Sequence, residues 1–257
     1  MKKFLAVSSL LLLAACATVP VTGRRSLILV PDAEVNALAL TSYTELMQKS
    51  KLSTDAAQVE MIRRVGKRIA AVSNQPDFKW EFNLIDDPKT VNAFCMPGGK
   101  VAFYTGILPI CKNEDGVAAV MGHEVAHAIA KHGSERMSQQ LLLNFGAMSL
   151  GTALQSKPET TKALANLAFG VGANLGFVLP HGRKQESEAD QIGIMYAAKA
   201  GYNPEEAISL WLRMDEHSKG QQPPEFLSTH PSHETRVRDL EKWMPDALKA
   251  YEEARGR

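Results

Sequence analysis

The chain has 257 residues, of which 45% are hydrophobic and 22% charged, with 29 Lys and Arg against 28 Asp and Glu. That length is enough for one or two domains with a full hydrophobic core. A formal charge of +1 argues against nucleic acid as the main partner, because phosphate binding needs a concentrated excess of Lys and Arg. Average glycine and proline usage and the lack of an internal repeat argue against collagen-like, broadly disordered and solenoid architectures.

The first residues have the pattern of a secretory signal peptide. Two lysines precede an apolar run from Phe4 to Ala15, which is too short to span a bilayer as a helix. The run ends at Leu13-Ala14-Ala15-Cys16, which resembles the bacterial lipobox, whose cysteine is lipidated. An ordinary cleaved signal peptide with a stray cysteine is the alternative. We expect a signal peptide over residues 1–15, lipidation of Cys16 and a tether over residues 16–31 that is poorly ordered at its start.

The residue after Cys16 suggests a location. It is Ala17, whereas an Asp there would resemble the signal that retains lipoproteins in the inner membrane. We therefore predict a cell-envelope lipoprotein anchored in the outer membrane and facing the periplasm. That compartment is oxidising, so Cys95 and Cys111 can form a disulfide or remain two buried thiols. The sequence leaves both options open.

The first half of the chain predicts two helices and a small sheet. Asp32 is a candidate N-cap for a helix over residues 33–50, and Asp55 for a helix over residues 56–73. The period then changes to alternation of apolar and polar residues over 78–84, which is typical of a half-buried strand. A short strand near 91–94, a turn at Pro97-Gly98-Gly99 and a strand over 100–105 complete a small antiparallel sheet.

From Asn113 onward the pattern is almost entirely helical. Segments 141–154 and 163–179 are rich in Leu, Ala, Phe and Gly. They fit buried core helices better than membrane-dipping ones, because each is short and interrupted by Asn or Gly. No linker divides residues 32–257, so we expect one domain there. The predicted helices cover residues 114–132, 134–154, 160–178, 184–200, 204–217 and 233–254.

One of these helices carries a motif with chemical meaning. His123-Glu124-Val125-Ala126-His127 has the form H-E-x-x-H, and residues four apart stand on the same face of a helix. Both imidazoles can therefore bind one zinc ion, which needs a third protein ligand and an open position for catalysis. Glu124 would take a proton from a water in that open position and later return it to the leaving amine. A surface helix with two unrelated histidines is the alternative, so a second signal is needed.

The second signal is Glu186-Ser187-Glu188-Ala189-Asp190, in a helix farther along the chain. Glu186 is the candidate third metal ligand. Asp190, one turn later, can accept a hydrogen bond from the far nitrogen of a ligating histidine and so orient it. A solvated acidic helix face is the alternative.

Two other residues compete for the third ligand position. Glu188 points about 160° away from Glu186 on an ideal helix. His132 is less attractive because the longer H-E-x-x-H-x-x-G-x-x-H pattern needs Gly and His where this chain has Ala130 and Gly133. We therefore prefer Glu186 as the third ligand and regard His132 as surface or structural.

Together these features resemble the HtpX/BepA-like zinc metallopeptidases, a gluzincin family that includes small lipoproteins of the LoiP and YcaL type. The resemblance runs from about Gly23 to about Arg238. It implies an α+β, mostly helical zincin-type metallopeptidase domain with a small antiparallel sheet and an H-E-x-x-H active-site helix. Further matching motifs are Thr22-Gly23-Arg24-Arg25, Asn92-Ala93-Phe94, Thr105-Gly106-Ile107-Leu108, Asn113-Glu114-Asp115 and Thr229-His230-Pro231.

The resemblance also implies roles for individual residues. His123, His127 and Glu186 would bind one Zn²⁺ per chain, with Glu124 as general base and acid. His230 matches a histidine that can approach the metal from a mobile loop, and a fourth ligand there would hold the enzyme latent by displacing the catalytic water. A loop histidine bound to a backbone carbonyl is the alternative. Arg236 matches a basic residue that could steady a tetrahedral oxyanion. The chain departs from many relatives at His181-Gly182-Arg183, where they carry Ser-Arg.

We therefore expect a zinc metalloendopeptidase of the bacterial cell envelope that degrades misfolded or unassembled envelope proteins. A non-proteolytic outer-membrane assembly factor with the same groove is the alternative. An extended substrate would pair through its main chain with an exposed sheet edge. The residues predicted for that edge are Lys100, Val101, Ala102, Phe103, Tyr104 and Thr105.

Overall fold

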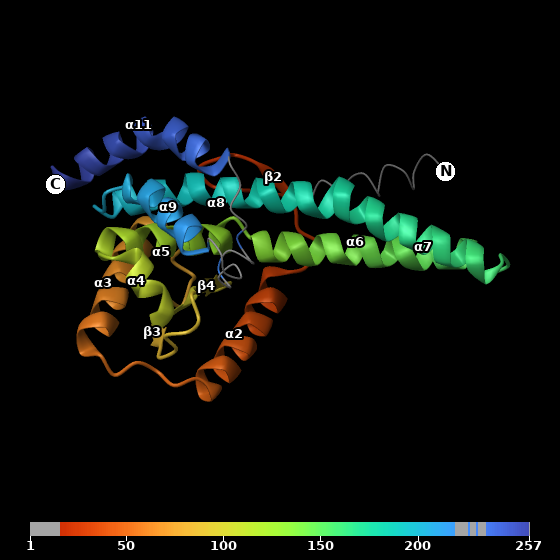
Figure 1. Cartoon of the computed structure of the whole chain (residues 1–257), viewed down its shortest axis with the longest axis horizontal. Helices are drawn as coiled ribbons and strands as arrows, with labels where there is room; N and C mark the ends of the chain where they lie inside the picture. Colours follow the sequence, from red (N-terminus) through yellow and green to blue (C-terminus); the bar gives the residue numbers. More distant parts are fainter. Residues whose placement is uncertain (1–15, 219–225, 227–229, 231–234, 257) are drawn as a thin grey trace.

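The computed structural model of the chain describes residues 16–218, 226, 230 and 235–256 (Figure 1). The predicted signal peptide 1–15, and Thr229 and Pro231 beside His230, lie outside these residues. Helices dominate and the strands are few and short, which confirms the predicted α+β, mostly helical fold class. The elements are β1 (Cys16–Thr18), β2 (Arg25–Leu27), α2 (Asp32–Lys49), α3 (Ala56–Val72), β3 (Glu81–Ile85), β4 (Ala93–Met96), β5 (Lys100–Tyr104), η1 (Thr105–Ile107), α4 (Leu108–Cys111), α5 (Glu114–Ile129), α6 (His132–Ala153), α7 (Glu159–Ala173), η2 (Asn174–Val178), α8 (Leu179–Lys199), α9 (Glu206–Ser218) and α11 (Thr235–Arg255).

Capping side chains set where two of the helices begin. Asp55 precedes α3 and accepts a hydrogen bond from the backbone amide three residues later, at 3.0 Å. Asn113 does the same for α5 at 2.9 Å. Each satisfies an amide that the first turn of a helix leaves unpaired. Asp32, by contrast, is not an N-cap but the first residue of α2, which follows Pro31 without a side-chain cap.

The sheet is mixed rather than antiparallel. β5 lies in the middle, pairing antiparallel with β4 and parallel with β3. The segment 86–92 leads from β3 to β4 and leaves a gap of one strand between them. After the turn that follows β4, β5 fills this gap. Gly98 and Gly99 make that turn with φ of +82° and +85°, a region that side chains other than glycine's disfavour.

The core is built around α5, which lies against α3, α8, α9 and β4. Every residue of α5 from Gly116 to Ile129 is buried, because neighbours cover it on all sides. Its closest approach is to α8, where two glycines face each other. A Cβ atom on Gly122 would lie 2.5 Å from the carbonyl oxygen of Gly193, and one on Gly193 would lie 2.8 Å from the backbone nitrogen of His123. The missing side chains let the two helices that carry the predicted ligands pack backbone against backbone.

The apolar segments 141–154 and 163–179 are not core helices, contrary to our expectation. They form most of α6 and of the α7–η2 stretch, which extend together beyond the rest of the molecule (Figure 1). No residue from 139 to 184 is buried. Apolar composition is shared by core, membrane and partner-binding helices, so it could not decide where these helices lie. We call the stretch 137–182 the helical arm.

The segment 16–31 differs from the loose tether that we expected. β1 and β2 pair as an antiparallel hairpin, with Cys16 opposite Leu27. The turn of this hairpin is fixed to the domain, because Arg24 forms ion pairs with Glu135 and Glu188. The hairpin is therefore part of the folded unit.

Cys95 and Cys111 do not form the disulfide that the sequence left open as an option. Cys95 and Cys111 are both free thiols, the first partly buried and the second fully buried. Burial raises the pKa of Cys111 to about 12.

Candidate metal centre

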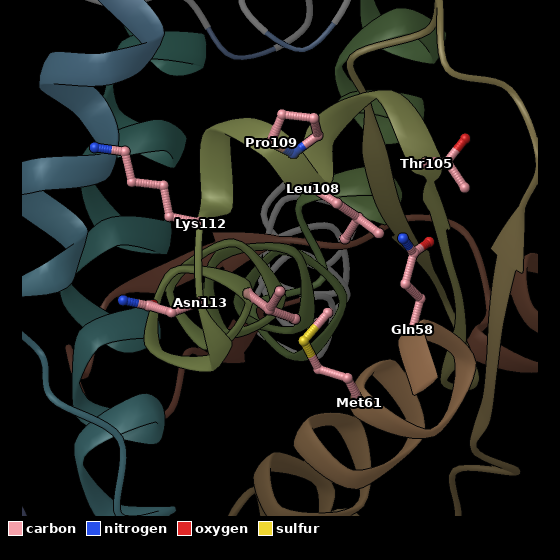
Figure 2. A pocket seen from close by; sticks show the side chains of 8 residues that line it. Gln58, Met61, Thr105, Leu108, Pro109, Lys112 and Asn113 are labelled. Atoms are coloured by element: carbon pink, nitrogen blue, oxygen red, sulfur yellow. The ribbon is translucent and has the colours of Figure 1, made fainter. Parts of the chain in front are cut away.

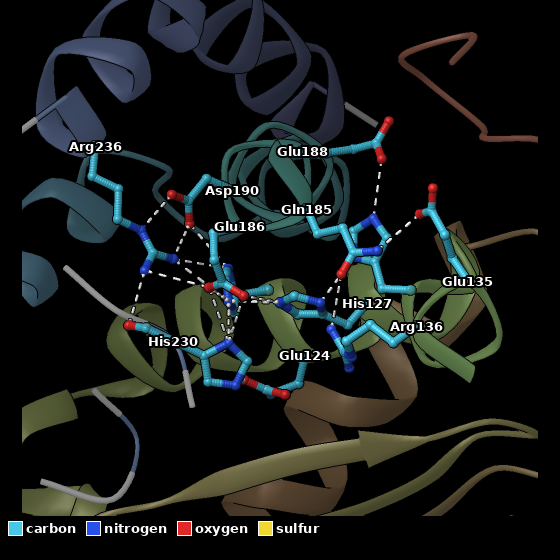
Figure 3. Close-up of polar contacts among 12 residues, drawn as sticks. Glu124, His127, Glu135, Arg136, Gln185, Glu186, Glu188, Asp190, His230 and Arg236 are labelled. Atoms are coloured by element: carbon cyan, nitrogen blue, oxygen red, sulfur yellow. Dashed lines mark hydrogen bonds and ion pairs between the residues drawn. The ribbon is translucent and has the colours of Figure 1, made fainter. Parts of the chain in front are cut away.

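The two histidines of the H-E-x-x-H motif face the same point from successive turns of α5. Their Nε2 atoms lie 3.1 Å apart, and both side chains are buried. Glu186 of α8 meets them, with its Oε2 atom 3.4 Å from Nε2 of His123 and its Oε1 atom 3.4 Å from Nε2 of His127. The α5–α8 contact therefore brings together the three residues proposed as ligands (Figure 3).

These separations suit a single zinc ion. Two ligand atoms that each lie about 2.1 Å from a tetrahedral zinc ion are about 3.4 Å from one another. His230 adds a fourth donor, with its Nδ1 atom 3.2 Å from Nε2 of His123 and 3.0 Å from Oε2 of Glu186. The four donor atoms all lie within 4.8 Å of one another. Two or three imidazoles and one carboxylate are a donor set that zinc binds readily.

The charge states of two of the buried donors, His127 and Glu186, also suit a cation. Burial holds the pKa of His127 well below its usual value, so the imidazole is neutral and has a lone pair to offer. Burial alone would raise the pKa of Glu186, but hydrogen bonds with His123 and His230 outweigh it and hold that pKa far below its ordinary range. The carboxylate is therefore ionised.

Asp190 of α8 and Arg236 of α11 orient this site. The Oδ1 atom of Asp190 lies 2.9 Å from Nδ1 of His123, so the Nδ1–H donates to the carboxylate and leaves Nε2 for the metal. Arg236 in turn donates to both oxygens of Asp190, at 2.6 and 2.7 Å, and its guanidinium lies over the ring of Trp211. This bidentate pair fixes Asp190, which lies where the sequence placed it.

The oxyanion role predicted for Arg236 stays a prediction, and its contacts, which include Nη1 at 3.5 Å from Oε2 of Glu186, assign it a positioning role as well. Its side chain is only 2% exposed. Besides the two bonds to Asp190, its Nη1 atom donates to the carbonyl oxygen of His230 at 3.3 Å. Each of the three nitrogens thus already meets a protein oxygen. These contacts indicate a positioning residue that joins Asp190 to the segment carrying His230.

Glu124 is buried beside the proposed ligands but does not join them. Its Oε1 atom lies 3.3 Å from Nε2 of His230 and has no hydrogen-bond partner in the part of the chain that the structure describes. Burial raises the pKa of Glu124 to about 7. A carboxyl group with a pKa near neutrality can accept and release a proton with similar ease, as a general base and acid must.

A second buried cluster lies on the other side of His127, and the sequence reasoning missed it. Nδ1 of His132 lies 2.9 Å from Nδ1 of His127, and Nε2 of His132 lies 3.0 Å from Oε2 of Glu188 (Figure 3). Glu188 accepts hydrogen bonds from Thr22 and, at 2.7 Å, from Arg24 of the N-terminal hairpin. A series of contacts therefore links the hairpin to His127, in the same way that Arg236 is linked to His123 through Asp190.

The turn between α5 and α6 explains why His132 faces back. Lys131 adopts a left-handed conformation with φ of 56°, which interrupts the helix between α5 and α6 and lets the side chain of His132 meet that of His127. No pattern of helical spacing reveals such a turn. Glu188 does point away from Glu186, as predicted, but it points into this second cluster rather than into water.

The predicted substrate strand is corrected by the structure. Lys100–Tyr104 is the central strand β5, with both edges paired, and its first four residues are buried. It therefore offers no edge to a substrate, and Thr105 lies beyond it in η1. Within the described residues the unpaired edge nearest to α5 belongs to β4.

A pocket of about 350 Å³ lies near the start of α5, away from the metal donors (Figure 2). None of the proposed ligands lines it. Its walls are formed by Gln58, Met61, Thr105, Leu108, Pro109, Lys112, Asn113 and Val117.

Comparison with known proteins found several related peptidases. The mitochondrial metalloendopeptidase OMA1 of Schizosaccharomyces pombe is 38% identical over 234 residues, which is 89% of this chain and 66% of that protein. The human mitochondrial metalloendopeptidase OMA1 is 32% identical over 250 residues, 91% of this chain and 47% of that protein. The beta-barrel assembly-enhancing protease of Escherichia coli is 28% identical over 201 residues, 76% of this chain and 40% of that protein. The chain thus spans roughly half the length of these relatives.

These relatives contradict the predicted location. The ones with the higher identities are named as mitochondrial, so the prediction of an outer-membrane lipoprotein facing the periplasm is wrong. That prediction depended on a short N-terminal pattern, which carries little information about which membrane system a protein serves. The predicted HtpX/BepA-like subtype is not confirmed either, because the beta-barrel assembly-enhancing protease is less similar to this chain, at 28% identity, than the OMA1 relatives are.

The family itself is clear. Residues 56–244 match the description "Peptidase family M48", a stretch that contains both motif helices and His230. This match covers well over half of the chain, and the chain therefore belongs to peptidase family M48.

Proposed function

We propose that this chain is a zinc-dependent metalloendopeptidase in which His123, His127 and Glu186 bind the metal. Family M48 peptidases use zinc, and the donor atoms of these three residues lie at the separations of a tetrahedral zinc site. That convergence is the observation that carries the proposal. A structural zinc site is disfavoured, because such sites are usually rich in cysteine and both described free cysteines lie outside this donor set.

Glu124 supplies the proton transfers in this proposal. A bound zinc ion supplies Lewis acidity toward the substrate carbonyl and water. The Oε1 atom of Glu124, which accepts no hydrogen bond from the described residues, takes a proton from the attacking water and later gives it to the leaving amine. Asp190 and His132 hold the two imidazoles in place through their Nδ1 atoms.

We propose that substrates bind as an extended strand along the edge of β4 that no described strand covers. This edge lies next to α5, and main-chain pairing there selects for segments that are already unfolded. Misfolded or flexible proteins are therefore the substrate class that we favour. The predicted restriction to a bacterial cell envelope is not retained, because the location on which it depended is contradicted.

Substitution of the general base tests the reaction. Glu124→Gln removes the proton acceptor but leaves all three metal ligands, so it should retain zinc and lose cleavage of casein. Glu60→Gln, an exposed change on α3, serves as the control and should leave both unchanged. Undiminished proteolysis by Glu124→Gln would exclude this role, whereas a zinc-loaded wild-type chain that cleaves no casein would favour the alternative of a non-proteolytic assembly factor.

We further propose that His230 holds the enzyme latent by occupying the fourth ligand position. Its Nδ1 atom is within the donor cluster, and its Nε2 atom lies beside Glu124, where it also blocks the base. His230→Ala should then cleave casein faster than the wild-type chain, whereas His181→Ala, whose imidazole binds a backbone carbonyl of the arm, should not. Equal rates for wild type and His230→Ala would remove the support for latency.

Lipidation of Cys16 remains a prediction from the sequence. Mass spectrometry of the mature N-terminus tests it directly: a diacylated Cys16 supports it, and an intact or differently cleaved N-terminus does not.

A further inference from the structure

The helical arm exposes an unusual amount of apolar surface. Large apolar side chains on α6 include Phe145, 71% exposed, and on α7 Leu164, 68% exposed. Monomeric soluble proteins rarely expose apolar patches of more than a few hundred Å². The exposed large apolar residues of the arm are Leu141, Leu142, Phe145, Met148, Leu164, Leu167, Val171, Leu175, Val178 and Leu179.

The arm also lacks charge over a defined length. Neither residues 137–156 nor residues 163–182 contain Asp, Glu, Lys or Arg, and each run is twenty residues long. At a rise of about 1.5 Å per residue the second run covers about 30 Å, the thickness of the hydrocarbon core of a bilayer, and the helical part of the first run, residues 137–153, covers about 25 Å. The second run lies within the continuous helix Glu159–Lys199, which is long and apolar enough to cross a membrane and whose apolar window has no buried residue.

The two runs lie antiparallel, with charged residues at both ends. At the base, Arg136 donates to Gln185, so the first run begins where the second one ends. Midway, Gly146 packs against the ring of Phe169. At the tip, Lys157 directly follows the first charge-free run and Lys162 directly precedes the second. The arm is therefore a helical hairpin with one uncharged zone between two basic ends.

Several polar side chains of the arm are satisfied within it. Ser149 and Thr152 donate to the carbonyl oxygens four residues earlier, and the Asn174 amide does the same. Gln140 donates to Asn144. In a hydrocarbon environment polar groups must be paired internally in this way, whereas an exposed helix in water does not need such bonds.

We propose that the helical arm inserts into a lipid bilayer as a hairpin. A second copy of the chain would cover one face of the arm and leave the other in water, where a charged face is expected. The arm has no charged face over either run, so a surrounding that contacts it on all sides fits better. Anionic lipid headgroups would meet the basic residues at the base, among them Arg136, Arg183 and Lys184.

Insertion would place the metal centre at the membrane surface. Glu186 follows the second run by four residues on the same helix, or about 6 Å along its axis, and His132 precedes the first run by a similar distance. The site would then act on segments that leave or approach the membrane. The proposal does not depend on catalysis, because its test measures only contact with lipid.

The test uses the full chain with an added tryptophan. Leu167→Trp and Leu142→Trp place the probe inside the two uncharged runs, and Leu212→Trp, at a comparably exposed position on α9, is the matched control. Each variant is mixed with vesicles of phosphatidylcholine and phosphatidylglycerol, with or without brominated phosphatidylcholine, which quenches tryptophan inside the bilayer. The zinc content of each variant shows that it has folded.

We expect brominated lipid to remove most of the fluorescence added at positions 167 and 142 and to leave that added at position 212 unchanged. The comparison separates the arm from the apolar N-terminal segment, which all variants share. Equal, unquenched signals at all three positions overturn the proposal, whether or not the protein floats with the vesicles. A dimer in lipid-free solution with an unquenched probe at position 167 would overturn it in favour of a second copy.

Discussion

The contact between Gly122 and Gly193 determines how closely the two ligand-bearing helices approach. Gly122→Ala adds a methyl group whose carbon would lie 2.5 Å from the carbonyl oxygen of Gly193, whereas ordinary contacts begin at 3.4 Å. The shortfall is about 0.9 Å, and it is against backbone, which cannot swing aside as a flexible side chain can. The helices must therefore separate, and Glu186 must move away from the histidines.

The expected cost has two parts. Overpacking of a buried contact destabilises by about 1–3 kcal/mol, which lowers the melting temperature of a chain of this size by about 2–12 °C. A metal site needs its ligands within about 0.5 Å of the productive geometry, and a displacement of about 1 Å costs about 100-fold in activity. Thermal unfolding with and without a chelator, together with zinc titration, measures both parts.

Gly133→Ala is the matched control. Gly133 lies in α6, where an added Cβ atom meets nothing within 4 Å, so this change should be neutral or stabilise by about 0.4–1 kcal/mol. The reasoning would be refuted if Gly122→Ala and Gly133→Ala had the same melting temperature and the same zinc affinity.

Two further predictions concern the second buried cluster. His132→Phe removes the side chain that contacts Nδ1 of His127, so it should lower zinc affinity about 10–100-fold, measured by competition with a chelator. Glu124→Gln is the control and should keep the affinity. Unchanged affinity in His132→Phe would show that this contact does not position the ligand. Burial alone would raise the pKa of Glu188, but hydrogen bonds from His132, Thr22 and Arg24 lower it to about 2 from an ordinary 4.5. A carboxyl group whose pKa is lower in the folded than in the unfolded chain stabilises the fold at pH values above its unfolded pKa. About 3 kcal/mol of unfolding free energy should therefore be lost as the pH falls from about 4.5 to about 2. Unfolding by urea across that range should show the loss in the wild-type chain and a flatter dependence in Glu188→Gln; parallel curves would contradict it.

Local spacing predicted the parts of the site that lie on single helices. The four-residue step between His123 and His127, and between Glu186 and Asp190, puts each pair on one helix face whatever the rest of the chain does. The helix starts at Asp55 and Asn113 were likewise local, since a cap bonds an amide three residues away.

What could not be predicted depends on how elements are ordered in space. Strand order is not encoded in strand spacing, so Lys100–Tyr104 was taken for an edge although it is central. The inward turn of His132 depends on one left-handed residue, Lys131. The exposure of the arm follows from how few of the described residues pack against it, which its apolar composition alone does not reveal.

Metal analysis of purified protein tests the central claim most directly. If His123, His127 and Glu186 bind one cation, the wild-type protein should contain one zinc ion per chain. The His127→Ala and Glu186→Ala variants should remain folded but contain no zinc. His181→Ala, outside the donor cluster, should keep it. A folded Glu186→Ala protein with a full complement of zinc would contradict the account.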